Sequence, residues 1–104
     1  MLAIYLVGSL VDRTFGSFVW DAEKEHLNMA KHGVDFETAA QVFLDPQRKA
    51  YADAKHSAKE QRYFCLGKIG HKVLTVRFLI RDGEIRIIGA GYWRKGERHY
   101  AQGH

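Results

Sequence analysis

Apolar and polar residues alternate along the C-terminal half of the chain in a pattern that predicts β-strands. A period of two residues places successive side chains on opposite faces of a sheet. The segments with this alternation are Arg62 to Gly67, Val73 to Ile80 and Ile85 to Ala90. Asp82-Gly83, between the last two, is typical of a two-residue type I′ hairpin turn. We therefore predict an antiparallel meander, preceded by a short strand around Lys49 to Ala52.

The N-terminal half instead predicts two helices. Asp21 can cap a helix from Ala22 to His32, whose first turn is acidic and whose last turn is basic. Gly33 suits the left-handed position that follows a helix end. Asp35 can cap a second helix, which Pro46 would stop. The apolar stripe of this second helix, at i, i+3, i+4 and i+7, consists of Phe36, Ala39, Ala40 and Phe43.

The order of these elements predicts an α+β fold. A short strand at Phe18-Val19-Trp20 precedes the two helices, and a short helix from Glu97 to Gln102 follows an irregular segment, residues 91–96. We expect the helices to pack on one face of an antiparallel sheet of three to four strands. This single domain should extend over residues 17–104.

Residues 1–16 begin with an apolar run that is too short to span a membrane. The run also lacks the basic region and the cleavage site of a signal peptide. We therefore interpret residues 1–16 as an N-terminal extension, from an upstream start or an artificial addition. An added edge strand is the alternative.

The Asp82-Gly83 turn predicts which strand residues share a face. With this turn, Ile80 faces Ile85, Leu79 faces Arg86 and Arg77 faces Ile88. The predicted core face consists of Leu74, Val76, Phe78, Ile80, Ile85 and Ile87. The opposite face consists of Thr75, Arg77, Leu79, Arg86, Ile88 and Ala90.

Two arginines on this second face, Arg77 and Arg86, are predicted to be diagonal neighbours. If the loop over residues 68–71 has an even length, Arg62 joins them from the preceding strand. Arginines without opposing carboxylates repel one another, and a phosphate held bidentately is their natural complement. The pattern favours an anion site; the alternative is a solvated face whose arginine stems cover Leu79 and Ile88.

Charge and composition narrow the function classes. The chain of 104 residues has a formal net charge of +4 and a pI of about 9.3, which favours RNA, DNA or an acidic protein as partner. A single cysteine, Cys65, excludes an internal disulfide and suits a reducing cytoplasm, where we expect a buried structural thiol. Six histidines occur, but no metal-ligand spacing, phosphate loop or nucleophile elbow does, so we predict no metal and no cofactor.

An ordered set of residues from Phe18 to Tyr100 resembles the BrnT family of bacterial type II toxins. The matching residues are Phe18-Val19-Trp20-Asp21, Lys31-His32-Gly33-Val34-Asp35-Phe36-Glu37, Ala39-Ala40, Val42-Phe43, Asp45-Pro46, Arg62-Tyr63, Leu66-Gly67 and Arg86-Ile87-Ile88, followed by a basic tail. The resemblance implies a RelE-like fold and ribonuclease activity. It also implies an antitoxin partner encoded beside the toxin, which we expect to be a dimeric ribbon-helix-helix protein that binds operator DNA.

The chain departs from the family pattern at the end of the last strand. The family commonly reads Ser-Ala-Arg there, whereas this chain reads Gly89-Ala90-Gly91. The arginine at the strand end is therefore missing. Arg94 or Lys95 would have to reach the same space from the following loop.

Metal-independent RNA cleavage needs a group that takes the 2′-OH proton, cations that stabilise the phosphorane and an acid for the 5′-oxygen. The resemblance implies that Lys, Arg and Tyr side chains fill these roles. The candidates for phosphate stabilisation are Arg62, Arg77 and Arg86, and those for proton transfer are Lys31 and His32. The candidates for binding RNA or the antitoxin are Trp93, Arg94, Lys95, Glu97 and Tyr100.

Simpler interpretations stand beside these roles. Lys31 and His32 complement the helix dipole, Glu97 suits a helix surface, and Tyr100 suits an anchoring aromatic. We predict a cytoplasmic ribonuclease toxin that inhibits translation. The alternatives are a non-catalytic toxin that binds an antitoxin and takes part in operon autoregulation, and a simple RNA-binding domain.

Overall fold

The computed structural model describes residues 18–102, so the predicted extension at residues 1–16 lies outside the described residues. The elements are β1 (Phe18–Trp20), α1 (Ala22–His32), α2 (Phe36–Ala40), the 3-10 helix η2 (Gln41–Leu44), β2 (Lys49–Ala52), the 3-10 helix η3 (Ala54–His56), β3 (Arg62–Ile69), β4 (Lys72–Arg81), β5 (Glu84–Gly91) and α3 (Arg94–Ala101). The α+β class is thus confirmed.

Both predicted caps of α1 are confirmed. The Asp21 carboxylate accepts hydrogen bonds from the backbone N–H groups of Glu23 and Lys24, at 2.8 and 3.2 Å. At the other end, Gly33 has a φ of 69°, the left-handed conformation that glycine adopts without steric cost. Local side-chain and backbone chemistry therefore sets the length of this helix.

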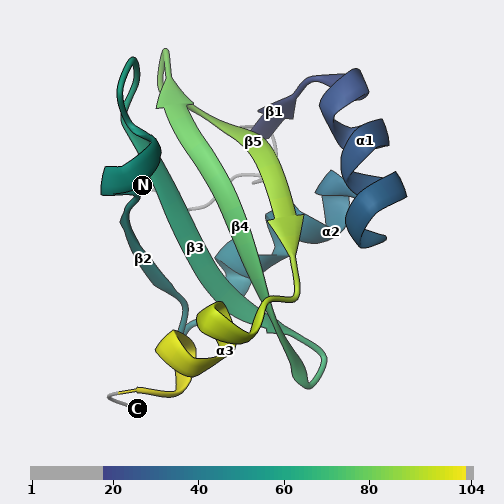
Figure 1. The fold of residues 1–104 in the computed structure, drawn as a ribbon. Helices are drawn as coiled ribbons and strands as arrows, with labels where there is room; N and C mark the ends of the chain where they lie inside the picture. Colours follow the sequence, from purple (N-terminus) through teal and green to yellow (C-terminus); the bar gives the residue numbers. More distant parts are fainter. Residues whose placement is uncertain (1–17, 103–104) are drawn as a thin grey trace.

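The described residues form one five-stranded sheet in the order β1-β5-β4-β3-β2 (Figure 1). The predicted antiparallel arrangement holds for β2 to β5, but the predicted number of strands is too low. β1 joins the sheet in parallel with β5, with Phe18 opposite Ile85 and Trp20 opposite Ile87. Because the partners of β1 lie more than 60 residues away, at residues 85–87, no local sequence pattern predicts this pairing.

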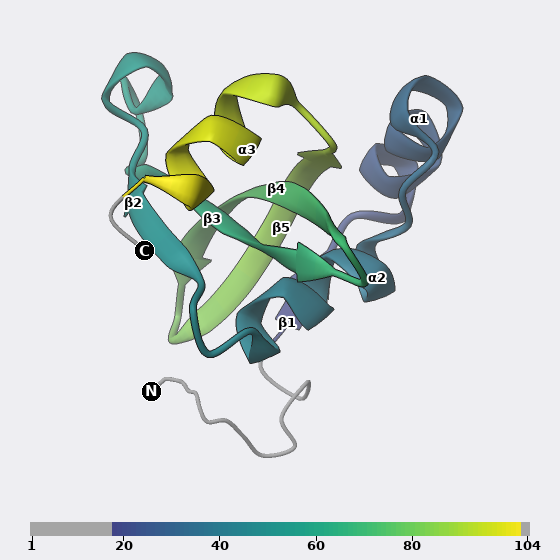
Figure 2. The ribbon, with the colours of Figure 1, turned by 90° about the horizontal axis from the view of Figure 1, so that it is seen from below.

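Helices cover both faces of the sheet, which corrects the prediction of a single covered face. On one face, residues of α2 and η2, such as Phe36 and Val42, form the main core with Val76 and Ile87. On the other face, α3 packs on β3 and β4, where Tyr100 forms a smaller cluster with Leu66 and Val73. Figure 2 shows α2 and α3 on opposite sides of the sheet. The second face is covered because the chain turns back over β3 and β4 after β5 and forms α3 there.

A β-bulge in β5 changes the predicted strand register. Near the turn the prediction is correct: Leu79 pairs with Arg86 and Ile80 with Ile85, and Asp82 and Gly83 have φ values of 54° and 77°. Between Phe78 and Arg77 the register shifts, so Arg77 pairs with Gly89 and not with Ile88. A bulge inserts one extra residue into one strand, which reverses the facing of every residue beyond it.

The bulge and the edge of the sheet correct two predicted burial assignments. Ala90, predicted on the arginine side, pairs with Val76 and is fully buried in the main core. Ile80, predicted as core, is 53% exposed because it lies beside the hairpin turn, away from the helices. Cys65 is buried as predicted, and burial raises the pKa of its thiol to about 12. It therefore stays a protonated, structural thiol at neutral pH.

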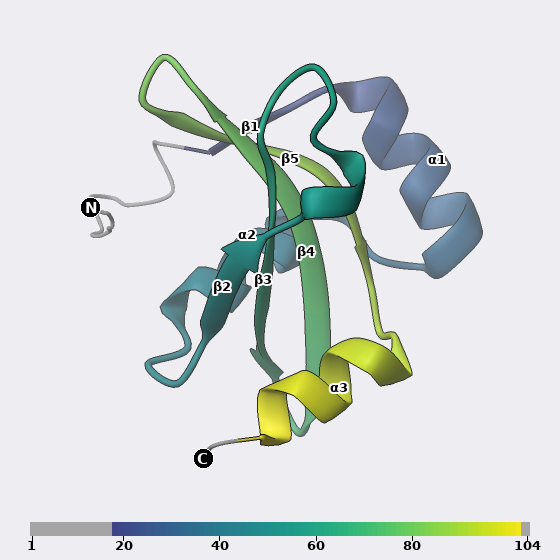
Figure 3. The ribbon, with the colours of Figure 1, turned by 60° about the vertical axis from the view of Figure 1, so that its left-hand side comes forward.

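Helix α3 begins at Arg94, three residues before the predicted start, and lies across the end of the sheet remote from the β4–β5 hairpin (Figure 3). Gly96 suggests a loop in the sequence, but a Cβ atom there would lie 2.0 Å from the Thr75 hydroxyl oxygen. Its missing side chain therefore permits close packing of α3 on β4. At the other end, the Lys49 ammonium group donates hydrogen bonds to the carbonyl oxygens of His99 and Gln102.

A hydrogen bond between Tyr100 and Asp45 ties α3 to the loop after η2. The Tyr100 hydroxyl donates to the Asp45 carboxylate at 2.6 Å, and the backbone N–H groups of Gln47 and Lys68 donate to the same carboxylate. Partial burial raises the pKa of Asp45, but these hydrogen bonds outweigh it and hold that pKa below its ordinary 3.8. The hydrogen bond to Asp45, with burial, raises the pKa of Tyr100 to about 12.

These shifts predict a loss of stability at both pH extremes. The contribution of Asp45 is complete above its ordinary pKa of 3.8 and declines as the pH falls below that value. That of Tyr100 is complete below its ordinary pKa of 10.0 and declines as the pH rises towards 12. Tyr100→Phe should cost about 1–2 kcal/mol at neutral pH and flatten the alkaline decline. Thermal unfolding measured across pH tests both effects, with Tyr92→Phe, at an exposed tyrosine, as control. An alkaline decline in Tyr100→Phe equal to that of wild type would contradict the prediction.

Candidate functional site

Three arginines share the sheet face that α3 covers in part, and we call Arg62, Arg77 and Arg86 the arginine face. Arg62 and Arg86 are the direct cross-strand partners of Leu79, one on each side. Arg77 points to the same face two residues earlier in β4. The loop between β3 and β4 has an even length, since Ile69 pairs with Lys72, so the prediction that all three arginines share a face is correct.

The guanidinium groups of the arginine face are only partly satisfied. The Nε atoms of Arg77 and Arg86 are buried and have no hydrogen-bond partner in the part of the chain that the structure describes. A buried donor without a partner costs about 1–3 kcal/mol. The Arg77 guanidinium lies over β5, since a Cβ atom on Gly89 would be 3.9 Å from its Nη1.

A basic pocket of about 280 Å³ opens at Arg62 and Arg86. Its lining residues are Asp21, Lys24, Glu60, Arg62, Leu79, Arg81, Arg86, Ile87 and Ile88. Both carboxylates are engaged: Asp21 caps α1, and Glu60 accepts hydrogen bonds from Arg81 at 2.8 and 3.1 Å. The hydrogen bond from Arg81, and beside it the positive charges of Arg81, Arg62 and Arg86, lowers the pKa of Glu60. Glu60 therefore stays ionised beside Arg81, while Arg62 and Arg86 face the pocket.

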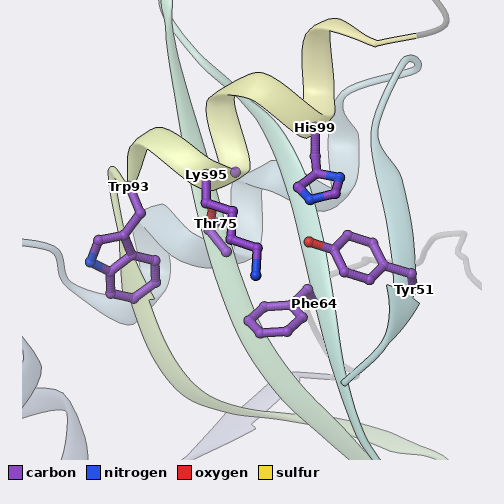
Figure 4. Close-up of a pocket in the computed structure, with 7 residues that line it drawn as sticks. Tyr51, Phe64, Thr75, Trp93, Lys95 and His99 are labelled. Carbon is purple, nitrogen blue, oxygen red and sulfur yellow. The ribbon is translucent and has the colours of Figure 1, made fainter. Parts of the chain in front are cut away.

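A second, larger pocket lies on the same face, between α3 and the sheet (Figure 4). This aromatic pocket has a volume of about 450 Å³ and is lined by Tyr51, Phe64, Thr75, Trp93, Lys95, Gly96 and His99. The sequence predicts Trp93 and Lys95 at a binding site, but not Tyr51, Phe64 or His99. These three meet only because β2 pairs with β3 and α3 folds back over both.

The structure separates the two cations that could replace the missing strand-end arginine. Gly91 pairs with Thr75, and a Cβ atom on Gly91 would lie 2.6 Å from a Trp93 ring carbon, so the indole occupies this space. Lys95 lines the aromatic pocket beside Trp93. Arg94 instead lines a neighbouring pocket. Trp93 lines both pockets, so Lys95 and Arg94 lie on either side of the indole that fills this space.

The remaining predicted site residues lie at different places. Lys31 and His32 are exposed at the end of α1, where the His32 ring packs edge-on against Trp93 at 5.1 Å. Glu97 is exposed and shares the pocket of Arg94. Tyr100 is buried against Asp45, the anchoring position that its alternative interpretation describes. The described fold thus connects His32, Trp93 and Lys95 but leaves Glu97 and Tyr100 outside the aromatic pocket.

Residues 18–102 contain no group of three or more His, Cys, Asp or Glu side chains that could hold a metal ion. Within the same range, every helix is too short or too polar to cross a membrane.

Comparison with known proteins gives one family match. The family model for the ribonuclease toxin BrnT of type II toxin–antitoxin systems matches residues 20–97, which include the arginine face and most of the aromatic pocket. A search of curated proteins found no match.

Proposed function

The chain belongs to the BrnT family of ribonuclease toxins of type II toxin–antitoxin systems, and we propose that it cleaves RNA at the arginine face without a metal ion. The observation that carries this proposal is that Arg62, Arg77 and Arg86 share one sheet face, on which Arg62 and Arg86 line the basic pocket. Phosphate oxygens accept hydrogen bonds from guanidinium groups bidentately. Cleavage of messenger RNA would in turn inhibit translation.

The proposed reaction is an internal transesterification of RNA. The 2′-oxygen attacks phosphorus and loses its proton to a base, while the bond from phosphorus to the 5′-oxygen breaks and that oxygen gains a proton. The arginine face stabilises the extra negative charge on the phosphorane, which is where fixed cations lower the barrier most. Lys31 and His32 are the proposed proton-transfer groups. They lie at the C-terminal end of α1, where His32 packs against Trp93, whereas Asp21 and Lys24 at the other end line the pocket of Arg62 and Arg86, so this role needs the cleaved phosphate to lie towards Arg77.

A type II system pairs its toxin with a protein antitoxin. We propose that a dimeric ribbon-helix-helix antitoxin masks the arginine face and brings the toxin to operator DNA. The positive charge of the chain supports this, since an acidic segment of the antitoxin would be attracted to the same groups as RNA.

Cleavage in the presence of a chelator tests the proposal. The purified toxin should cut single-stranded RNA equally well with and without EDTA and leave 2′,3′-cyclic phosphate ends. Addition of the protein encoded beside the toxin should stop the cleavage, and added salt should weaken this inhibition. Activity that disappears with EDTA and returns with Mg²⁺ would contradict the metal-independent mechanism. A toxin that binds the adjacent protein but leaves RNA intact would instead be a non-catalytic member of the family.

A further inference from the structure

We propose that the aromatic pocket holds one unpaired RNA base, next to the phosphate at Arg77, and thereby sets the sequence preference of the toxin. This inference rests on the proposed function, since it assumes that RNA lies on the arginine face. It adds a ligand class for the pocket and three residues, Tyr51, Phe64 and His99, that the sequence patterns do not point to.

The pocket adjoins the arginine face directly. Phe64 is the cross-strand partner of Arg77, and Thr75 is the next residue of β4 on the same face. Side chains of directly paired residues start about 5 Å apart, which is within the reach of one nucleotide. The Arg77 guanidinium lies over Gly89 of β5 and Trp93 lies over Gly91 of the same strand, so a phosphate at Arg77 would place the attached nucleoside at the Trp93 side of the pocket.

The pocket walls suit the flat ring of a base. Tyr51 lies with its ring centroid 5.3 Å from that of Phe64 and 5.7 Å from that of His99, with interplanar angles of 36° and 37°. Figure 4 shows Trp93 on the opposite side of the pocket from Tyr51, with Phe64 below. Aromatic side chains bind unstacked bases of any sequence through their faces. The volume of about 450 Å³ lies in the range of ligand pockets.

Lys95 gives the pocket a means of discrimination. Its ammonium group projects into the space between Trp93 and Tyr51 (Figure 4). An ammonium group only donates hydrogen bonds, so it favours bases that present carbonyl oxygens. Guanine, uracil and cytosine each carry such an oxygen, whereas adenine carries none. We therefore expect adenine to be the least favoured base in the pocket.

A library of short single-stranded RNAs with random sequence tests this, with cleavage sites read by sequencing. Wild type should disfavour adenine at one fixed position beside the cut. Phe64→Leu should slow cleavage roughly tenfold, by loss of one stacking surface. Lys95→Met should raise the share of adenine at that position. Tyr92→Leu removes an exposed aromatic outside the pocket and should change neither.

Each outcome decides the inference. If both variants remain folded, Phe64→Leu cleaves at the wild-type rate and Lys95→Met keeps the wild-type base profile, the pocket does not read a base. If they instead lose affinity for the antitoxin while cleavage is unchanged, the pocket is a protein-docking site.

If the toxin does not cleave RNA, the proposed function is refuted, but base binding in the aromatic pocket can still be tested. Fluorescence anisotropy with labelled, uncleavable 2′-O-methyl tetranucleotides would then show weaker binding by Phe64→Leu than by Tyr92→Leu if a base enters. Equal binding by both variants would overturn the inference.

Discussion

Arg77→Ala and Arg86→Ala should each slow RNA cleavage roughly 100- to 1,000-fold, the range seen when one preorganised donor to a transition-state oxyanion is lost. Arg62→Ala should act in the same direction. The reason is that Arg62 and Arg86 line the basic pocket and Arg77 lies on the same face over β5, so all three place positive charge near the proposed phosphorane. Single-turnover cleavage of a fluorescent RNA measures the rate, and growth after induction without the antitoxin should recover in step.

The stability of these variants separates catalysis from structure. The Nε atoms of Arg77 and Arg86 are buried without partners among the described residues, so their removal deletes an unsatisfied donor. We therefore expect unfolding temperatures equal to or above that of wild type. Such a gain in stability with a loss of activity is typical of functional sites.

Two controls complete the test. Arg98→Ala removes an exposed positive charge on α3 and should leave cleavage nearly unchanged. It therefore shows how much of the loss in the other variants comes only from the lower net charge. Arg86→Lys keeps the charge but loses the planar fork, so it should recover only part of the activity. Wild-type cleavage by Arg86→Ala would move the phosphate site away from the arginine face.

Asn28→Leu should destabilise the fold by about 3–5 kcal/mol, because it leaves three buried backbone groups without partners. The Asn28 amide nitrogen donates to the carbonyl oxygens of Val34 and Ala90, both at 2.9 Å. Its amide oxygen accepts from the backbone N–H of Ala90 at 3.1 Å. β1 pairs with β5 only as far as Ile87, so beyond it this one side chain takes the place of a paired strand.

Urea unfolding followed by circular dichroism measures this loss. The matched control is Leu27→Ala, the preceding residue of α1, which is 54% exposed and should change the free energy of unfolding by less than about 0.5 kcal/mol. A loss below about 1 kcal/mol for Asn28→Leu would mean that water or a shift of α1 satisfies the edge of β5. Asn28→Asp should also destabilise, because a carboxylate cannot donate to either carbonyl.

Local chemistry in the sequence was sufficient to predict α1, the β4–β5 hairpin and the shared face of the arginines. Asp21 and Gly33 define the ends of α1, because capping involves only neighbouring backbone groups. Asp82-Gly83 defines the hairpin, because its positive φ values match the twist of the adjoining strands. From that turn, period-two alternation places Leu79, Arg86 and Arg77 on one face.

Tertiary structure decided what depends on distant parts of the chain. The bulge in β5 moves Ala90 into the core, since register beyond a turn follows from packing against the helices and not from a local signal. The parallel pairing of β1 and the side on which α3 lies depend on the path of the chain. The aromatic pocket exists only where β2, β3 and α3 meet, because Tyr51, Phe64 and His99 come from three separate elements whose individual patterns carry no information about one another.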